Sequence, residues 1–243
     1  MNDEQKIMDV LLKHHEFVRE RKLNPVMTVL VGSQNYDLAT PDSDYDTFTF
    51  VLPSIKAIAG LADPISTTLA DEHGHINIKD IRLALNNLKR TSPNSVECFA
   101  SHYKYVEDEF KFLSDMAPIA FRCDTRNMMN AIGGMATQLK TRNMSSGKRL
   151  AHLLRLHCMV YNYMSIRSDI LSMTEMEHDL AMKAKLNPNK PDWELLIPEW
   201  ERIVQEDVEV DLGYYDDRAK YGLELIEYAQ VRCVRRAVDG SWH

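Results

Sequence analysis

Apolar side chains recur at helical spacing near the start of the chain, at Ile7, Val10, Leu11 and Val18. This spacing puts them on one face of a helix and predicts a helix over Glu4 to Arg21. A short run of apolar and β-branched residues from Val26 to Val31 predicts a buried strand. Strand character returns from Asp44 to Val51. Because successive side chains of a strand point to opposite faces, Asp44 and Asp46 share one face of this segment.

The pattern changes further along the chain. Gly74 to Lys79 predicts another short strand, and after it the apolar residues follow helical spacing. Asn94 and Glu97 have the spacing of a capping box at the start of a helix. The sequence therefore predicts a small α/β half, residues 1–117, followed by a helical half, residues 118–243.

The composition is that of a globular protein. The 243 residues are 44% hydrophobic and 27% charged, which excludes disordered and collagen-like classes. Four cysteines are scattered without a CxxC pair, which argues against a zinc site or a set of disulfides. No apolar stretch approaches the roughly 20 residues that cross a bilayer, and the first residues lack the apolar centre of a signal peptide. We expect a cytoplasmic protein with no membrane partner, and the oligomeric state stays open.

The net charge of −7 is unevenly distributed along the chain. From Thr125 to Ser168 there are seven basic residues and no acidic residue. Within this segment, Ser146 to Met164 has helical spacing and brings Lys148, His152 and Arg155 within about 60° of one another. A local excess of positive charge in an acidic protein indicates a site for phosphate or another anion, although a solvated basic helix face has the same pattern.

The most informative stretch lies between the first two predicted strands. Gly32 and Ser33 follow the first strand, and Asp44 and Asp46 open the second. Aspartates on one face of a strand lie roughly 7 Å apart at the backbone, close enough to share one or two divalent cations. Because neighbouring carboxylates repel, a cation between them keeps both ionised. The glycine lets a phosphate approach the backbone, and the serine supplies hydroxyl and amide donors.

This arrangement resembles the polymerase-beta-type nucleotidyltransferase superfamily, whose mark is a strand, a Gly-Ser turn and a second strand with D-x-D. Residues 32–46, GSQNYDLATPDSDYD, are similar to the RNA-ligase-associated predicted nucleotidyltransferases of bacteria and their phages. Residues 80–85, 94–99 and 148–155 support the likeness, which covers about three quarters of the chain. The resemblance implies an α+β fold, in which a small mixed β-sheet core flanked by helices precedes a helical C-terminal domain.

The resemblance also implies roles for the residues of the first motif. Gly32 and Ser33 would grip the triphosphate of an incoming nucleotide. Asp44 and Asp46 would act in catalysis by holding Mg²⁺ or Mn²⁺. The metal would bridge the phosphates and offset the charge that develops as a hydroxyl attacks and pyrophosphate leaves.

The basic helix has an implied role as well. Lys148, His152 and Arg155 would bind the triphosphate or the phosphates of a nucleic-acid acceptor. The implied activity is metal-dependent transfer of a nucleoside monophosphate from an NTP to a hydroxyl group. An RNA or tRNA end is the first candidate acceptor, which places the protein in RNA repair.

Two residues depart from the family pattern. Asp37 stands where the family usually has glycine, and His75 stands about where a third acidic residue is expected. That third carboxylate often acts as the base. We include Asp80, one residue past the predicted strand, as the third catalytic candidate, with Asp71 and Glu72 before the strand as alternatives.

Two other functions stay open at this point. If no third carboxylate completes the site, the chain would be a nucleotide- or RNA-binding module that keeps the fold without turnover. An antitoxin-like interaction protein, whose acidic C-terminal half pairs with a basic partner, is the other alternative. The sequence identifies neither the nucleotide nor the acceptor.

Overall fold

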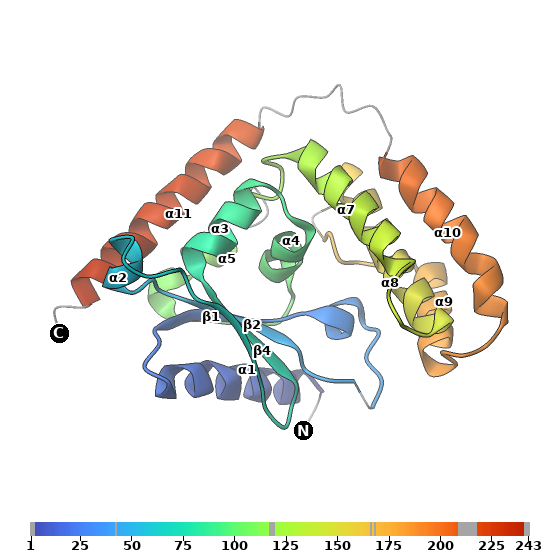
Figure 1. Cartoon of the computed structure of the whole chain (residues 1–243), viewed down its shortest axis with the longest axis horizontal. Helices are drawn as coiled ribbons and strands as arrows, with labels where there is room; N and C mark the ends of the chain where they lie inside the picture. Colours follow the sequence, from blue (N-terminus) through green and yellow to red (C-terminus); the bar gives the residue numbers. More distant parts are fainter. Residues whose placement is uncertain are drawn as a thin grey trace. The chain divides into compact units, whose positions relative to one another are not determined.

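The computed structural model of the chain describes residues 3–41, 43–116, 120–165, 167, 169–208 and 218–240 (Figure 1). Contacts between residues divide the chain into two compact units. Unit 1 comprises Met1–Gly32, Asp44–Asp124 and Asp216–His243, and unit 2 comprises Ser33–Ser43 and Thr125–Tyr215. The domain boundary expected between residues 117 and 118 lies outside the described residues.

A five-stranded mixed sheet forms the centre of unit 1. Its strands, in spatial order, are β3 (Ser66–Ala70), β4 (His75–Asp80), β2 (Thr47–Val51), β1 (Pro25–Leu30) and β5 (Lys104–Val106). β2 and β4 are parallel, and the other neighbouring pairs are antiparallel. Every residue of β1, including the polar Thr28, is buried, because β1 lies inside the sheet with helices over both faces.

Helices cover both faces of this sheet (Figure 1). α1 (Asp3–Glu20) packs along one face, and α3 (Ile81–Lys89) and α4 (Pro93–Ala100) lie on the other. The remaining helical segments described in unit 1 are α2 (Ile55–Ile58), η2 (Asp108–Phe110), α5 (Phe112–Asp115) and α11 (Arg218–Gly240). α11 packs against α3. The core beneath the sheet joins Val18 of α1 to Val51, Ile76 and Ile78.

Two buried histidines on α1 hydrogen-bond to the sheet. His14 Nδ1 lies 2.9 Å from Thr47 Oγ1, and His15 Nδ1 lies 3.0 Å from Thr28 Oγ1. Burial lowers the pKa of both imidazoles, although a nearby carboxylate acts on each in the opposite direction. Both histidines are therefore neutral at neutral pH and serve as polar links within the core.

Unit 2 is helical in its larger segment. Its described helices are α7 (Thr125–Leu139), α8 (Ser146–Met164), α9 (Glu175–Leu186) and α10 (Asp192–Val208). α8 lies at the centre and packs against the other three. Gly147 permits a close approach, since a Cβ there would lie 2.1 Å from the Ala184 carbonyl oxygen. Its amide also donates to the Pro188 carbonyl over 2.8 Å, which fixes the start of α8 against the end of α9.

The predicted mixed α+β fold is confirmed, with a helical region in the C-terminal half. The sequence does not predict β3, because this edge strand is mostly exposed and lacks an apolar face, nor the three-residue β5. The prediction of a capping box formed by Asn94 and Glu97 is wrong, because Ser92 is the N-cap residue of α4 and Pro93 follows it in the first turn. None of the described helices combines the length and the apolar character needed to cross a membrane.

Candidate active site

The two aspartates of the D-x-D motif lie where β1 ends and β2 begins. Both precede β2, whose first residue is Thr47, so the observed strand is shorter than predicted. The Val31 amide donates to the Asp46 carbonyl over 2.9 Å, which extends the pairing of β1 and β2 by one step. The Asp46 side chain is 44% exposed, and Asp44 is exposed. Asp46 therefore stands beside the residue that precedes the glycine of the Gly-Ser turn.

The turn after β1 is shaped by Gly32. Its φ of +84° lies in the region that favours glycine, and the turn continues as the 3₁₀ helix η1 (Gly32–Tyr36). The Gly32 amide donates to Glu97 Oε1 over 2.9 Å. Because the Gly32 amide already donates to Glu97, it is not available to bind a phosphate, and the role of Gly32 is to allow the backbone conformation of the turn. Sequence reasoning missed this role of Glu97, since the two residues are 65 positions apart.

His75 lies at the position expected for a third site residue. It begins β4, and the parallel register pairs the next residue, Ile76, with Thr47. The His75 amide and Nδ1 lie 3.2 and 3.1 Å from Asp46 Oδ1. The imidazole is 58% exposed. The structure therefore brings an imidazole, rather than a third carboxylate, to the side chain of Asp46.

The turn between β3 and β4 supports the acidic segment. The Tyr45 amide donates to the His73 carbonyl over 3.0 Å, and Asp71 Oδ1 accepts from the His73 and Gly74 amides at 2.8 and 3.1 Å. Asp71 Oδ2 lies 3.1 Å from His14 Nε2. Burial acts to raise the pKa of Asp71, but the amide bonds and His14 together hold it below its ordinary value. Asp71 is thus an ionised anchor of the turn and not a free ligand.

The third catalytic candidate from the sequence, Asp80, lies at the other end of β4. It pairs in register with Val51, five residues and about 16 Å along the strand from His75. Its side chain is 1% exposed, caps α3 through the Arg82 amide and forms an ion pair of 2.7 Å with the Arg82 guanidinium. Asp80 therefore holds the start of α3, and we leave it out of the proposed site.

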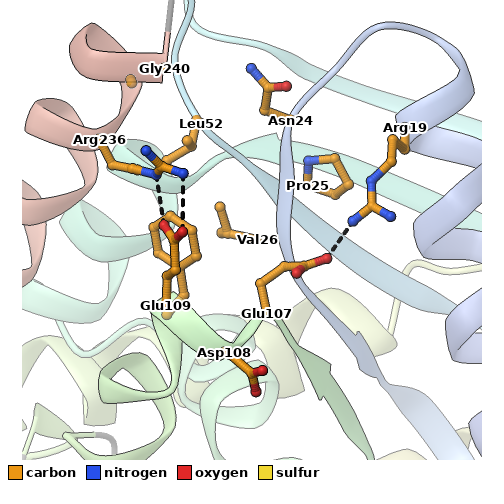
Figure 2. Close-up of a pocket in the computed structure, with 12 residues that line it drawn as sticks. Arg19, Asn24, Pro25, Val26, Leu52, Glu107, Asp108, Glu109, Arg236 and Gly240 are labelled. Atoms are coloured by element: carbon orange, nitrogen blue, oxygen red, sulfur yellow. Dashed lines mark hydrogen bonds and ion pairs between the residues drawn. The ribbon is translucent and has the colours of Figure 1, made fainter.

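A cavity of about 430 Å³ lies at this other end of the sheet, where β1 begins at Pro25 (Figure 2). Arg19 and Arg236 face into it from α1 and α11. Each guanidinium is paired with a carboxylate of the wall, Arg19 with Glu107 and Arg236 with Glu109. Because these cations are already neutralised, the cavity is a poor site for a triphosphate.

The chain enters unit 2 after Gly32, and α9 fixes the loop that follows. His178 Nε2 lies 3.0 Å from the Asp37 carbonyl oxygen, and Lys185 Nζ donates to the Leu38 carbonyl. Asp37 has a φ of +54°. Aspartate is one of the few non-glycine residues that tolerate this region, which explains how it occupies a position where glycine is usual. The Arg155 guanidinium lies 4.4 Å from the centre of the Tyr36 ring.

Cationic side chains surround His152 on α8. Burial, followed by the charges of Arg155, Arg142, Lys185 and Lys148, lowers the pKa of His152 to about 4. The imidazole is therefore neutral at pH 7 and contributes no charge of its own. Within the described part of the chain, Lys148, Lys185 and Arg142 form no ion pair with a carboxylate. This cationic cluster contains the three residues singled out in the sequence, and Lys185 joins them from the next helix.

The model of the RlaP family, the RNA repair pathway DNA polymerase beta family, matches residues 6–187. The chain belongs to this family. Membership in the RNA repair pathway DNA polymerase beta family confirms the resemblance to polymerase-beta-type nucleotidyltransferases, and the matched segment includes the acidic motif and the cationic cluster. No curated protein matches the chain at a significant level.

Polymerase-beta-type nucleotidyltransferases typically use divalent cations, and the acidic motif offers carboxylate oxygens, which are ligands that such cations prefer. Asp44 makes no hydrogen bond or ion pair within the residues that the structure describes. Asp46 uses one oxygen for His75. The ligand atoms of Asp44, Asp46 and His75 do not all lie within 4.8 Å of one another, so these three side chains do not form a closed ligand set in the described conformation.

One group in the described residues does have ligand atoms within 4.8 Å, and it consists of His157, Cys158 and Glu177. Glu177 Oε1 lies 2.5 Å from His157 Nδ1, and Oε2 accepts from the amide and hydroxyl of Thr174 in a capping box. Burial acts to raise the pKa of Glu177, but these bonds lower it to about 2. Because both carboxylate oxygens are in use, we interpret this group as a link between α8 and α9.

Proposed function

We propose that the chain transfers a nucleoside monophosphate from an NTP to a hydroxyl group of an RNA end, with a divalent cation. The observation that supports this most directly is the acidic motif at the start of β2, beside the glycine turn that ends β1, in a member of the RNA repair pathway DNA polymerase beta family. Transfer of this kind needs positioning and charge stabilisation and no nucleophilic side chain.

Each residue of the motif has a distinct role in this proposal. Asp44 and Asp46 hold the cation, which offsets the negative charge that develops at the α-phosphate. Ser33 donates its hydroxyl and amide to phosphate oxygens, and Gly32 gives the turn its shape. Glu97 holds the Gly32 amide and so keeps the turn in place.

The cationic cluster of unit 2 supplies phosphate-binding groups. Lys148, Arg155 and Lys185 lie around a neutral His152, so their charges are concentrated and favour an anion. Burial lowers the pKa of Lys185, and the charges of Arg155 and Lys148 lower it further; a bound phosphate would offset the repulsion among these charges. These groups bind phosphates of the nucleotide or of the RNA.

The direct experiment incubates the purified chain with each α-labelled NTP, Mg²⁺ or Mn²⁺ and a pool of RNA with free ends. We expect transfer of label to RNA and release of pyrophosphate. Asp44→Asn and Asp46→Asn should each reduce the rate at least about 100-fold, since a catalytic metal contributes several kcal/mol and each 1.36 kcal/mol is tenfold. Asp63→Asn, at an exposed loop position, is the matched control and should act as wild type.

A second candidate is a nucleotide- or RNA-binding module without turnover. The observation that favours it is the imidazole of His75 in the place expected for a carboxylate base. It predicts NTP binding in calorimetry with no label transfer under any metal. Multiple turnover by the wild-type chain would exclude it, whereas equal behaviour of wild type, Asp44→Asn and Asp46→Asn would remove the leading proposal.

A further inference from the structure

The donor set around Asp46 is unusual for a magnesium site. Its nearest side-chain neighbour is an imidazole, with His75 Nδ1 3.1 Å from Asp46 Oδ1. The His75 amide bonds the same oxygen, so the backbone at the start of β4 fixes the imidazole beside this carboxylate. The ring is more than half exposed, so a solvated cation has access to it.

Two of the three other carboxylates considered for an all-oxygen site, Asp71 and Asp80, are held elsewhere. Asp71 is bonded to two amides of its own turn and lies 3.1 Å from His14. Asp80 is buried against Arg82 at the far end of β4. The Glu72 side chain is 84% exposed and its nearest ionic contact is His73, at 3.5 Å. Among these residues, His75 is the one whose side chain contacts Asp46.

We propose that His75 is a ligand of the cation held by Asp44 and Asp46, and that this site selects Mn²⁺ over Mg²⁺. The inference rests on the proposed function for the presence of a cation, and it assigns the third ligand and the metal preference. Mg²⁺ is a hard ion that takes oxygen ligands in near-ideal octahedral geometry. Imidazole suits transition metals, and Mn²⁺ accepts both carboxylate and nitrogen donors.

Binding of Mn²⁺ tests this assignment without reference to activity. Electron paramagnetic resonance measures free and bound Mn²⁺, and pulsed spectra of the bound ion reveal coupling to a histidine ¹⁴N nucleus. We expect ¹⁴N coupling in the wild-type chain, its loss in His75→Asn, and its retention in His73→Asn. His73 is the matched control, because its imidazole lies in the same turn but contacts Lys13 and Glu72 instead of Asp46.

Affinity gives the second readout. Even residues that only support a metal ligand typically contribute 10- to 100-fold in affinity, so His75→Asn should weaken Mn²⁺ binding by at least about tenfold. His75→Asp restores an all-oxygen set and should lower the ratio of Mn²⁺ to Mg²⁺ affinity by about tenfold or more. Circular dichroism of each variant verifies that the exposed substitution leaves the fold intact.

The outcomes separate this inference from the proposed function. If bound Mn²⁺ shows no ¹⁴N coupling, or His75→Asn keeps both coupling and affinity, the ligand assignment is overturned, while label transfer that depends on Asp44 and Asp46 still stands. If Asp46→Asn binds Mn²⁺ as tightly as wild type, the cation lies elsewhere and both proposals fail. Coupling that disappears only in the His75 variants, with a reduced preference for Mn²⁺, supports the assignment.

Discussion

Two helical glycines of unit 2 provide a sharp test of the packing that supports the cationic cluster. A Cβ at Gly147 would lie 2.1 Å from the Ala184 carbonyl oxygen and 2.7 Å from Pro188 Cα, and both are backbone atoms that cannot rotate away. A Cβ at Gly134, in the interior of α7, would meet nothing within 4 Å. The same substitution to alanine should therefore have opposite effects at the two positions.

The magnitudes follow from these distances. The 2.1 Å contact is about 1.3 Å short of ordinary van der Waals contact at 3.4 Å, so α8 and the end of α9 must separate in Gly147→Ala. Overpacking of this kind typically costs about 1–3 kcal/mol, and the clash is with backbone, which favours the upper part of that range. In Gly134→Ala the change adds no clash and gains about 0.8–1 kcal/mol of helix propensity.

Thermal unfolding followed by circular dichroism measures the difference. For a chain of this size 1 kcal/mol shifts the Tm by roughly 2–4 °C. We expect Gly147→Ala to unfold several degrees below wild type and Gly134→Ala a few degrees above it. Equal stability of the two variants would refute the close approach of α8 and α9 that the structure describes.

Three further predictions concern charge and backbone. Asp37→Gly should keep or raise stability, whereas Asp37→Ala should lose about 1 kcal/mol in urea unfolding, because φ is +54° there; equal loss in both would contradict this conformation. Burial lowers the pKa values of His14 and His15 in the folded chain below 6.5. Their contribution to stability is therefore complete above pH 6.5 and is lost as the pH falls through these lowered pKa values. Unfolding free energy should decrease from pH 7 to pH 5, and a flat profile would contradict their burial. Lys185→Met should raise the pKa of His152 from about 4 in an NMR titration, since Lys185 is one of the charges that depress it; an unchanged value would place Lys185 away from the cluster.

Local patterns account for the parts of the fold that the sequence predicts correctly. α1, α8 and β1 each bury residues against neighbouring elements. The pattern of apolar residues that reflects this burial extends over a few adjacent positions, so it can be recognised in the sequence. β3 lacks such a signal because its exposed edge has no apolar face. The sequence therefore predicts an element best where burial is periodic.

Long-range pairs account for most of what the sequence does not predict. Glu97 has the local spacing of a capping box, yet its carboxylate accepts from the Gly32 amide, 65 residues away. Asp80 is acidic and close in sequence to the third expected position, yet the strand register carries it to the opposite end of β4, where it caps α3. In both cases the side-chain type is compatible with two roles, and the tertiary structure selects one, through the packing of α4 on β1 for Glu97 and through the register of β4 for Asp80.

The two departures from the family pattern have different physical meanings. Asp37 keeps the backbone conformation that glycine provides, because aspartate tolerates positive φ, so this substitution preserves the turn. His75 keeps the position of a site residue beside Asp46 but replaces oxygen by nitrogen, so this substitution preserves the geometry and changes the chemistry. The hydrogen bond from the Gly32 amide to Glu97, and the Asp71 loop anchored by its own amides, hold the backbone around the acidic motif. The difference that the Mn²⁺ experiment tests is therefore the donor atom at His75, because aspartate at position 37 leaves the backbone of the turn unchanged.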